Sequence, residues 1–267
     1  MYKMLNVGCG HRFHKNWINI DVDPASPDVL KVNIIQGLPF NDNSFEVVYH
    51  SNVLEHLPFE LGKAMIEECY RVLKPGGIIR INVPDLEKIC REYLLNMEKA
   101  AGGNESASYN YNWILIEMFD QVSRNKSGGK MAEYLSAKNI PNPEYLKSRL
   151  GDYFDNWRAN LGNTNPKKSF FKKIKLVWKH PILLKKIWYS FVLTKKEKEW
   201  LSIGKFRLGG EIHYHMYDRY SLKDLLTKTK FRNIEVKSAV ESNIVDWTKY
   251  NLDYPNDNAG LFVEAIK

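Results

Sequence analysis

The sequence predicts an α/β fold in which a mostly parallel sheet is flanked by helices and ends in an antiparallel C-terminal edge. Over residues 1–90, short apolar segments alternate with helix-like segments, an alternation typical of βαβ units. The same pattern returns after residue 208, whereas the stretch between is rich in lysine and in helix-like periodicity. We therefore expect residues 1–100 and 209–267 to form the core, and residues 101–208 to form a mostly helical insertion or cap.

The first part of the chain contains five short apolar runs, each of which predicts a strand. They are residues 4–7, 17–22, 29–34, 45–49 and 78–83. A helix is expected over 61–73, because Met65, Cys69 and Val72 then share one face. The Lys-Pro-Gly-Gly sequence at 74–77 is a stop signal, so we expect a loop there.

The insertion begins with two helix-like patterns, at 86–99 and 113–124, separated by glycine-containing loops. A lysine-rich segment at 167–198 follows, with aromatic side chains interleaved among the lysines. Three interpretations stay open for it: a solvated helical face with its aromatics packed inward, an anion-binding lid, or an interfacial helix on anionic lipid.

The last part of the chain returns to the pattern of the core. A helix is expected to open at Tyr220, with Ser221 as its N-cap and Asp224 in the capping-box position. Strands are expected at 234–238 and 261–266, and these would form the antiparallel edge of the sheet.

Composition limits the classes of partner and compartment. The chain has 267 residues and a formal net charge of +8, which favours anionic partners such as phosphorylated substrates, nucleic acid or an anionic membrane surface. The three cysteines, Cys9, Cys69 and Cys90, make neither a disulfide framework nor a Cys-x-x-Cys zinc pair. We expect a cytoplasmic protein with no signal peptide and no transmembrane segment; peripheral membrane contact and the oligomeric state stay open.

A glycine turn follows the first expected strand. Residues 5–10 read Leu-Asn-Val-Gly-Cys-Gly, and Gly-x-Gly after a strand lets a ligand approach the backbone closely. A dinucleotide fingerprint needs a third glycine at position 13, which is Phe13, and this argues against NAD. Asp21, at the end of the second strand, can accept both hydrogen bonds of a ribose diol, or it is a turn residue before Pro24.

Two later segments carry a family resemblance. Residues 45–57 (Phe-Glu-Val-Val-Tyr-His-Ser-Asn-Val-Leu-Glu-His-Leu) and 71–77 (Arg-Val-Leu-Lys-Pro-Gly-Gly) resemble class I S-adenosylmethionine-dependent methyltransferases, in the small-molecule type 11 branch. The resemblance covers residues 4–85 and implies a Rossmann-like fold. It also implies S-adenosylmethionine as the cofactor and S-adenosylhomocysteine as its product.

The resemblance implies a set of cofactor contacts. Gly8 and Gly10 would lie against the methionine part, Asp21 would hold the ribose, and Ser51 would lie near the sulfonium. Asn33 and the backbone of Ile34 would meet the adenine. The full expected set is Asn6, Gly8, Cys9, Gly10, Asp21, Val22, Asn33, Ile34, Ser51 and Asn52. The sequence departs from the family pattern at Asn6 and Asn33, where acidic residues are usual, and at Arg12, where a glycine is frequent.

Methyl transfer to a hydroxyl calls for a general base, most often histidine or a carboxylate. His56 follows the fourth strand, at the edge where ligands bind, or it caps the following loop. Glu55 is expected to be structural and to pair with a basic neighbour.

A second set of candidates follows the insertion. At strand spacing, His213, His215 and Tyr217 would share one face. Type 11 sequences resemble this stretch at His213 and at the Tyr-Asp pair of 217–218, so His213 is the first candidate for a base or substrate ligand. The alternative is that the stretch packs the insertion onto the core. We expect no metal site, because no third ligand stands at metal spacing.

We therefore expect O-methylation of a small polar acceptor, one that is anionic or phosphorylated. Similar type 11 proteins are associated with bacterial capsule and surface polysaccharide biosynthesis, which suggests a sugar, a nucleotide-activated sugar or a phosphorylated precursor. One alternative is a nucleic-acid methyltransferase, against which stands the lack of an Asn/Asp-Pro-Pro-Tyr-like motif. Another is a non-catalytic scaffold that keeps the cofactor fold.

Overall fold

The computed structural model describes residues 3–161 and 192–267 and contains one seven-stranded sheet in the order β3-β2-β1-β4-β5-β7-β6. Its strands are β1 (Met4–Val7), β2 (Ile18–Asp21), β3 (Val29–Lys31), β4 (Phe45–Ser51), β5 (Leu73–Pro84), β6 (Arg232–Lys237) and β7 (Gly260–Ile266). Strands β3 to β5 of this order run parallel, while β7 is antiparallel to both β5 and β6. The expected α/β fold with an antiparallel C-terminal edge is confirmed.

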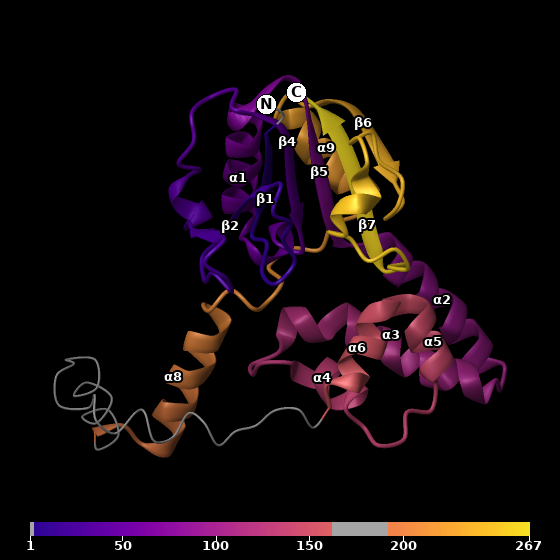
Figure 1. The fold of residues 1–267 in the computed structure, drawn as a ribbon. Coiled ribbons are helices and arrows are strands. Elements are labelled where there is room, and N and C mark those ends of the chain that lie inside the picture. Colours follow the sequence, from indigo (N-terminus) through magenta and orange to yellow (C-terminus); the bar gives the residue numbers. More distant parts are fainter. Residues whose placement is uncertain (1–2, 162–191) are drawn as a thin grey trace.

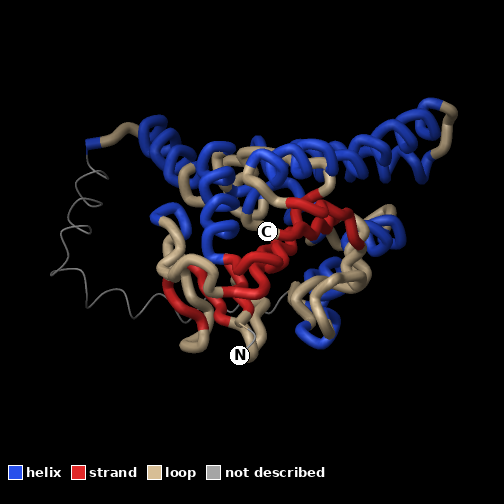
Figure 2. The backbone as a smooth tube through the Cα atoms, turned by 90° about the horizontal axis from the view of Figure 1, so that it is seen from above, coloured by secondary structure: helices blue, strands red, loops and turns tan. Residues whose placement is uncertain are grey.

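Helices cover one face of the sheet and its lower end, and a 3-10 turn lies against the other face. They are α1 (Phe59–Val72), α2 (Leu86–Ala101), α3 (Glu105–Ser123), α4 (Gly129–Leu135), α5 (Pro143–Leu150), α6 (Asp152–Ala159), α8 (Lys195–Arg207) and α9 (Arg219–Lys228), with the 3-10 turns η1 (Ile34–Gln36), η2 (Leu54–His56) and η5 (Trp247–Tyr250). In Figure 1, α2 to α6 lie below the sheet, at the carboxyl ends of the parallel strands, and α8 stands apart from them. Figure 2 shows the sheet in the middle, with other segments on either side.

Three apolar clusters hold these layers together. The largest joins β1, β4 and β5 to α1 and α9, and includes the fully buried Leu5, Ile66 and Leu222. The opposite face of the sheet is covered by an aromatic cluster around Tyr49 and Trp247. Helices α2 to α6 share a third cluster around Trp113, so this part of the chain buries an apolar core of its own.

Residues 8–17 turn from β1 to β2 without a crossover helix. The local structure differs from expectation after α1 and before α9. Strand β5 starts at Leu73 directly after α1 and resumes regular pairing at Ile78, so residues 74–77 are an irregular part of the strand rather than a loop. Helix α9 is capped by Asp218, because the capping box runs from Asp218 to Ser221 rather than from Ser221 to Asp224.

Most of the lysine-rich segment, residues 167–191, lies outside the described residues. Within the described ranges, no helix combines the length and the apolar character that crossing a bilayer requires.

Candidate functional site

Two neighbouring cavities open where the parallel strands end. The first, which we call the glycine cavity, has a volume of about 260 Å³. It is lined by Asn6, Gly8, Cys9, Gly10, His11, Arg12, Tyr49, Ser51, Asn52, Asn82, Leu252, Asp253, Tyr254 and Asp257. It lies at the point where β1 sits between β2 and β4, the crevice in which open parallel sheets bind their ligands.

The turn after β1 owes its shape to glycine. Gly8 and Gly10 have φ values of +64° and +52°, a region that other residues rarely adopt. A Cβ atom on Gly8 would lie 2.5 Å from a methyl carbon of Val53, so no larger residue fits there without a shift. The Asp21 carboxylate secures the turn by accepting hydrogen bonds from the N–H groups of Gly10 (2.8 Å) and Asp23 (2.9 Å).

The floor of the glycine cavity is polar and held in place. The buried amide of Asn6 donates to the Arg12 carbonyl (3.0 Å) and to the Asn19 side chain (3.2 Å). The Arg12 guanidinium lies over the Tyr254 ring, 3.5 Å from its centroid, and so joins the N-terminal turn to a C-terminal loop. Burial and the nearby Asp21 carboxylate raise the pKa of Cys9 to about 11.

Six of the ten expected cofactor residues line this cavity: Asn6, Gly8, Cys9, Gly10, Ser51 and Asn52. Asp21 does not line the cavity itself, but its carboxylate accepts a hydrogen bond from Gly10, which does. Val22, Asn33 and Ile34 are outside it. The side-chain Oδ1 of Asn33 accepts a hydrogen bond from the Ile35 N–H and caps η1, and β3 ends at Lys31. The adenine contact of Asn33 stays a prediction.

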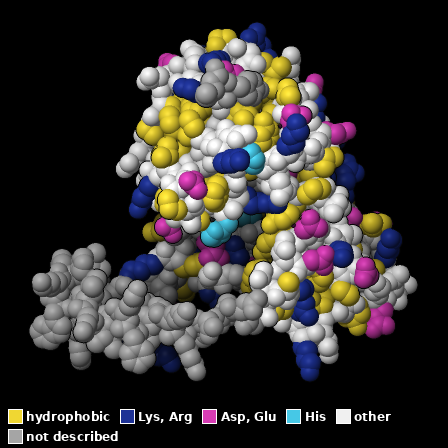
Figure 3. Space-filling view, viewed as in Figure 1, with side chains coloured by type: hydrophobic (Ala, Val, Ile, Leu, Met, Phe, Trp, Pro, Cys, Tyr) yellow, Lys and Arg dark blue, Asp and Glu magenta, His cyan; other side chains and the backbone are white. Residues whose placement is uncertain are grey.

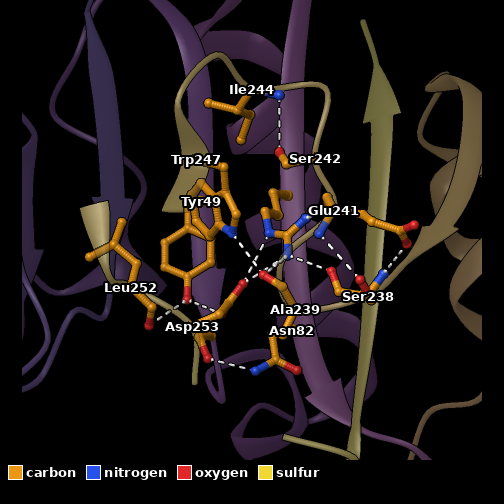
Figure 4. A network of polar contacts seen from close by, with 12 residues as sticks. Tyr49, Asn82, Ser238, Ala239, Glu241, Ser242, Ile244, Trp247, Leu252 and Asp253 are labelled. Carbon is orange, nitrogen blue, oxygen red and sulfur yellow. Dashed lines mark hydrogen bonds and ion pairs between the residues drawn. The ribbon is translucent and has the colours of Figure 1, made fainter. Parts of the chain in front are cut away.

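The far wall of the glycine cavity rests on a buried ion network, drawn in Figure 4. Arg80 on β5 donates to Asp253 (3.0 Å) and to Glu264 on β7 (2.8 Å). Its remaining N–H groups reach the carbonyls of 238, 239 and 241, and Tyr49 donates to Asp253 at 2.6 Å. Sequence reasoning missed this network. Its signal was a charged residue inside each of two otherwise apolar strands, 78–83 and 261–266.

The second cavity, which we call the histidine cavity, has a volume of about 250 Å³ and shares Asn52, Tyr254 and Asp257 with the first. Its remaining lining is Glu55, His56, Pro84, Ile89, Glu117, Gln121, Met131, Leu150, Tyr153, His213, Ala259 and Gly260. It lies between the sheet and helices α2 to α6. Figure 3 shows histidine side chains where the surface is hollowed between these two parts.

His56 and His213 face each other across this cavity, their ring centroids 4.6 Å apart in an edge-to-face arrangement. The Nδ1 of His56 lies 3.1 Å from the Ile212 carbonyl, which only accepts, so Nδ1 carries the proton and Nε2 is left with a lone pair. Burial lowers the pKa of both imidazoles, that of His213 to about 3, so both are neutral at pH 7.

Glu55 contradicts its expected pairing with a basic neighbour. Its side chain is 1% exposed, and neither carboxyl oxygen has a hydrogen-bond partner. Burial raises the pKa of this carboxyl to about 8. The Glu55 backbone carbonyl accepts from the Tyr214 N–H (2.8 Å), and His213 donates its N–H to the Gln121 carbonyl (3.0 Å), so backbone contacts hold the two segments together.

The expected strand through His213, His215 and Tyr217 is wrong. The segment is irregular, with one isolated bridge between Tyr217 and Asp85. His213 therefore turns to His56, whereas His215 packs on Phe59 and on Tyr217, with ring centroids 5.4 and 4.5 Å away. Neither His215 nor Tyr217 lines the histidine cavity. Glu55, His56 and His213 each offer a possible ligand atom, and these atoms lie within 4.8 Å of one another, a grouping that residue spacing did not indicate.

The comparisons with known proteins point to one class of enzyme. A demethylmenaquinone methyltransferase of Listeria monocytogenes is 27% identical over 159 residues, which cover 48% of this chain and 66% of that protein. A probable S-adenosylmethionine-dependent methyltransferase of Mycolicibacterium smegmatis is 30% identical over 99 residues, covering 31% of this chain and 38% of that protein. The chain thus spans less than two thirds of the length of these curated relatives.

Among solved structures, a SAM-dependent methyltransferase of Archaeoglobus fulgidus aligns with 100% of this chain and 86% of its own, at 13% identity and a TM-score of 0.40. Residues 5–81 match the family described as "Methyltransferase domain". That range contains the glycine turn, β4 and the Glu55–His56 pair. Residues 5–81 of this chain therefore match a methyltransferase domain.

Proposed function

We propose that the protein transfers a methyl group from S-adenosylmethionine to an oxygen of a small polar acceptor. The observation that carries the proposal is the wall shared by the two cavities, made of Asn52, Tyr254 and Asp257. A methionine end held at Gly8 and Gly10 would present its sulfonium to this wall, with the acceptor on the other side. The adenosine end would then extend past Asp21 towards the exposed ends of β2 and β3.

Methyl transfer from a sulfonium is an in-line displacement, so the protein has to orient the acceptor and help remove its proton. The histidine cavity offers His213 and His56 for this, side by side and on the acceptor side of the shared wall. We assign the handling of the acceptor hydroxyl to this pair, with His213 as the first candidate.

The chemistry of the lining favours a hydroxyl-rich acceptor such as a sugar. Polar side chains such as Gln121 and Tyr153 line part of the histidine cavity, and such groups recognise hydroxyls by hydrogen bonding. A third cavity, of about 290 Å³, shares Gln121 and Tyr153 with the histidine cavity and leads on to Arg124. Arg124 also lines a larger hollow of about 780 Å³ beside α3 and α8, together with two lysines of the insertion.

This arrangement suggests an acceptor whose sugar lies inside the histidine cavity. Its phosphate would lie outside that cavity, near Arg124 and the two lysines, under helices of the 101–208 segment. Nucleotide-activated or phosphorylated sugars of bacterial capsule and surface polysaccharide biosynthesis fit that description. The names of the Listeria relatives suggest a quinone instead. We place the quinone second, because a quinone has no phosphate for the basic groups outside the histidine cavity.

The test is methyl transfer from radiolabelled S-adenosylmethionine by the full chain to three acceptor groups: nucleotide sugars, phosphorylated sugars and demethylmenaquinone. We expect labelled product from the first two groups. The His213→Ala variant should lower turnover by roughly 10²–10⁴-fold while it keeps cofactor affinity. Labelling of the quinone alone would overturn the sugar assignment, and no cofactor binding at millimolar concentration would leave a non-catalytic scaffold. Salt-sensitive binding and methylation of RNA would favour the nucleic-acid alternative.

A further inference from the structure

We propose that Glu55, His56 and His213 form a binding site for one divalent transition-metal ion in the histidine cavity. Each of the three side chains offers a ligand atom, and these atoms all lie within 4.8 Å of one another. Glu55 and His56 belong to η2, while His213 comes from the segment that follows α8. Ion binding itself does not depend on methyl transfer; only the catalytic role given to the ion rests on the function proposed above.

The state of Glu55 is the first argument. Its carboxyl lines the cavity, is almost fully buried, and has no donor on either oxygen. A buried carboxylate without a counter-charge is unstable, so such groups are normally paired or bound to a metal. Among the described residues, no ion pair involves Glu55. A divalent cation would give the ionised form of this carboxyl the partner that the described residues do not offer.

The histidines are prepared in the way that metal ligands are. A metal-binding imidazole usually donates its other ring N–H to a carbonyl or carboxylate, which fixes the ring and its tautomer. His56 does this through Nδ1 and the Ile212 carbonyl, which leaves Nε2 free to bind an ion. The Nδ1 of His213 is buried without a hydrogen-bond partner.

Two imidazoles and one carboxylate make an N/O ligand set that suits Zn²⁺, Fe²⁺ or Co²⁺ better than Mg²⁺ or Ca²⁺. The ligand atoms lie within 4.8 Å of one another, so small side-chain rotations would be enough to place each of them about 2.0–2.2 Å from one ion. Three protein ligands leave at least one coordination position facing the cavity, where an acceptor oxygen would bind.

An ion bound at this site would determine how the acceptor hydroxyl loses its proton in the proposed methyl transfer. A hydroxyl bound to the ion loses its proton more readily, and the proton passes to water in the open cavity. The oxygen then forms a bond to the methyl carbon while the carbon–sulfur bond breaks. The electron pair of that bond goes to sulfur, neutralises the sulfonium and leaves S-adenosylhomocysteine. The histidines would then act as ligands that place the acceptor rather than as bases.

The test is a titration of the tag-free, chelator-treated full chain with Zn²⁺ and with Co²⁺. Calorimetry should give one Zn²⁺ per chain, and Co²⁺ should produce a visible absorption band of a protein-bound ion. Glu55→Gln and His213→Ala should each weaken Zn²⁺ binding by at least tenfold, because each removes one of three ligands. Glu60→Gln, an exposed glutamate of α1, and His215→Ala, whose ring packs on Phe59 and Tyr217, are the matched controls and should bind Zn²⁺ like the parent protein.

The same Glu55→Gln protein should bind S-adenosylmethionine with unchanged affinity. This measurement distinguishes a failure of the metal site from a failure of the proposed methyl transfer. Loss of cofactor binding in the parent chain with Zn²⁺ binding intact would refute the function but not the metal site. Zn²⁺ binding that is absent from the parent, or equally strong in Glu55→Gln, would overturn the metal site. Each variant must first give the circular dichroism spectrum of the folded parent protein before its binding is compared.

Discussion

Replacement of Arg80 by methionine tests whether the ion network behind the glycine cavity stabilises the fold. The Arg80 side chain is fully buried, and so are the carboxylates of Asp253 and Glu264 that it binds. Methionine fills a similar space but leaves both carboxylates without their cation, and it leaves three carbonyls without their donor. Removal of one partner from a buried ion pair costs about 3–5 kcal/mol.

We expect a loss at the upper end of this range, because two carboxylates share the one cation. Glu264 keeps hydrogen bonds from Ser242 and from the Asn243 N–H, so its part of the loss is the smaller one. A whole domain is stable by about 5–15 kcal/mol, so the variant should lose a third or more of its free energy of unfolding. Asp253 belongs to the loop that lines the glycine cavity, and cofactor affinity should fall as well.

The assay is urea unfolding followed by tryptophan fluorescence, with Trp247 as a reporter because Arg80 lies 4.4 Å from its ring centroid. The control is Arg71→Met, since Arg71 makes a comparable number of contacts but its side chain is 30% exposed. Exposed ion pairs contribute less, so the control should lose less than half as much. A loss below about 1 kcal/mol in Arg80→Met would refute the reasoning. Neutralising the partners too, in Arg80→Met with Asp253→Asn and Glu264→Gln, should restore part of the stability.

Three further predictions concern the glycine cavity. Gly8→Ala should weaken S-adenosylmethionine binding at least tenfold in calorimetry, because its Cβ would clash at 2.5 Å and its φ is positive; equal affinity would contradict this. Asp21→Ala should weaken the same binding by about 1–3 kcal/mol, whereas the exposed neighbour Asp23→Ala should not; equal effects would remove Asp21 from the site. At pH 8 iodoacetamide should alkylate the exposed Cys90 long before Cys9, because a pKa of about 11 keeps Cys9 a thiol. The rate of Cys9 alkylation should rise as the pH approaches 11. Rapid alkylation of Cys9 at pH 8 would show that this thiol is not buried.

The fold could be predicted because its signals are local. The apolar runs at 4–7 and 45–49, and the Gly-x-Gly turn after the first of them, are patterns of neighbouring residues that any parallel sheet requires. Errors arose where two local signals competed. Ser221 and Asp218 are both good capping residues, and only the structure shows that Asp218 takes the cap. Residues 74–77 carry loop-forming glycines, yet pairing with β4 draws Leu73 into the strand.

The sites were harder to predict because they join distant segments. The glycine turn was found, since its residues are contiguous and their conformation depends on residue type. The proximity of Glu55 and His213 depends on how the segment after α8 returns to η2, and sequence periodicity carries no information about that return. The same holds for Arg80, whose partners Asp253 and Glu264 come from the C-terminal part of the chain. Charged residues in apolar strands were visible in the sequence, but their pairing was not.

A crystal structure of the full chain with S-adenosylhomocysteine tests the account most directly. The account predicts the amino-acid end of the ligand between Gly8 and Asn52, its ribose at Asp21, and its sulfur facing the histidine cavity across Tyr254 and Asp257. A ligand bound elsewhere, or one whose sulfur points away from the histidine cavity, would contradict it.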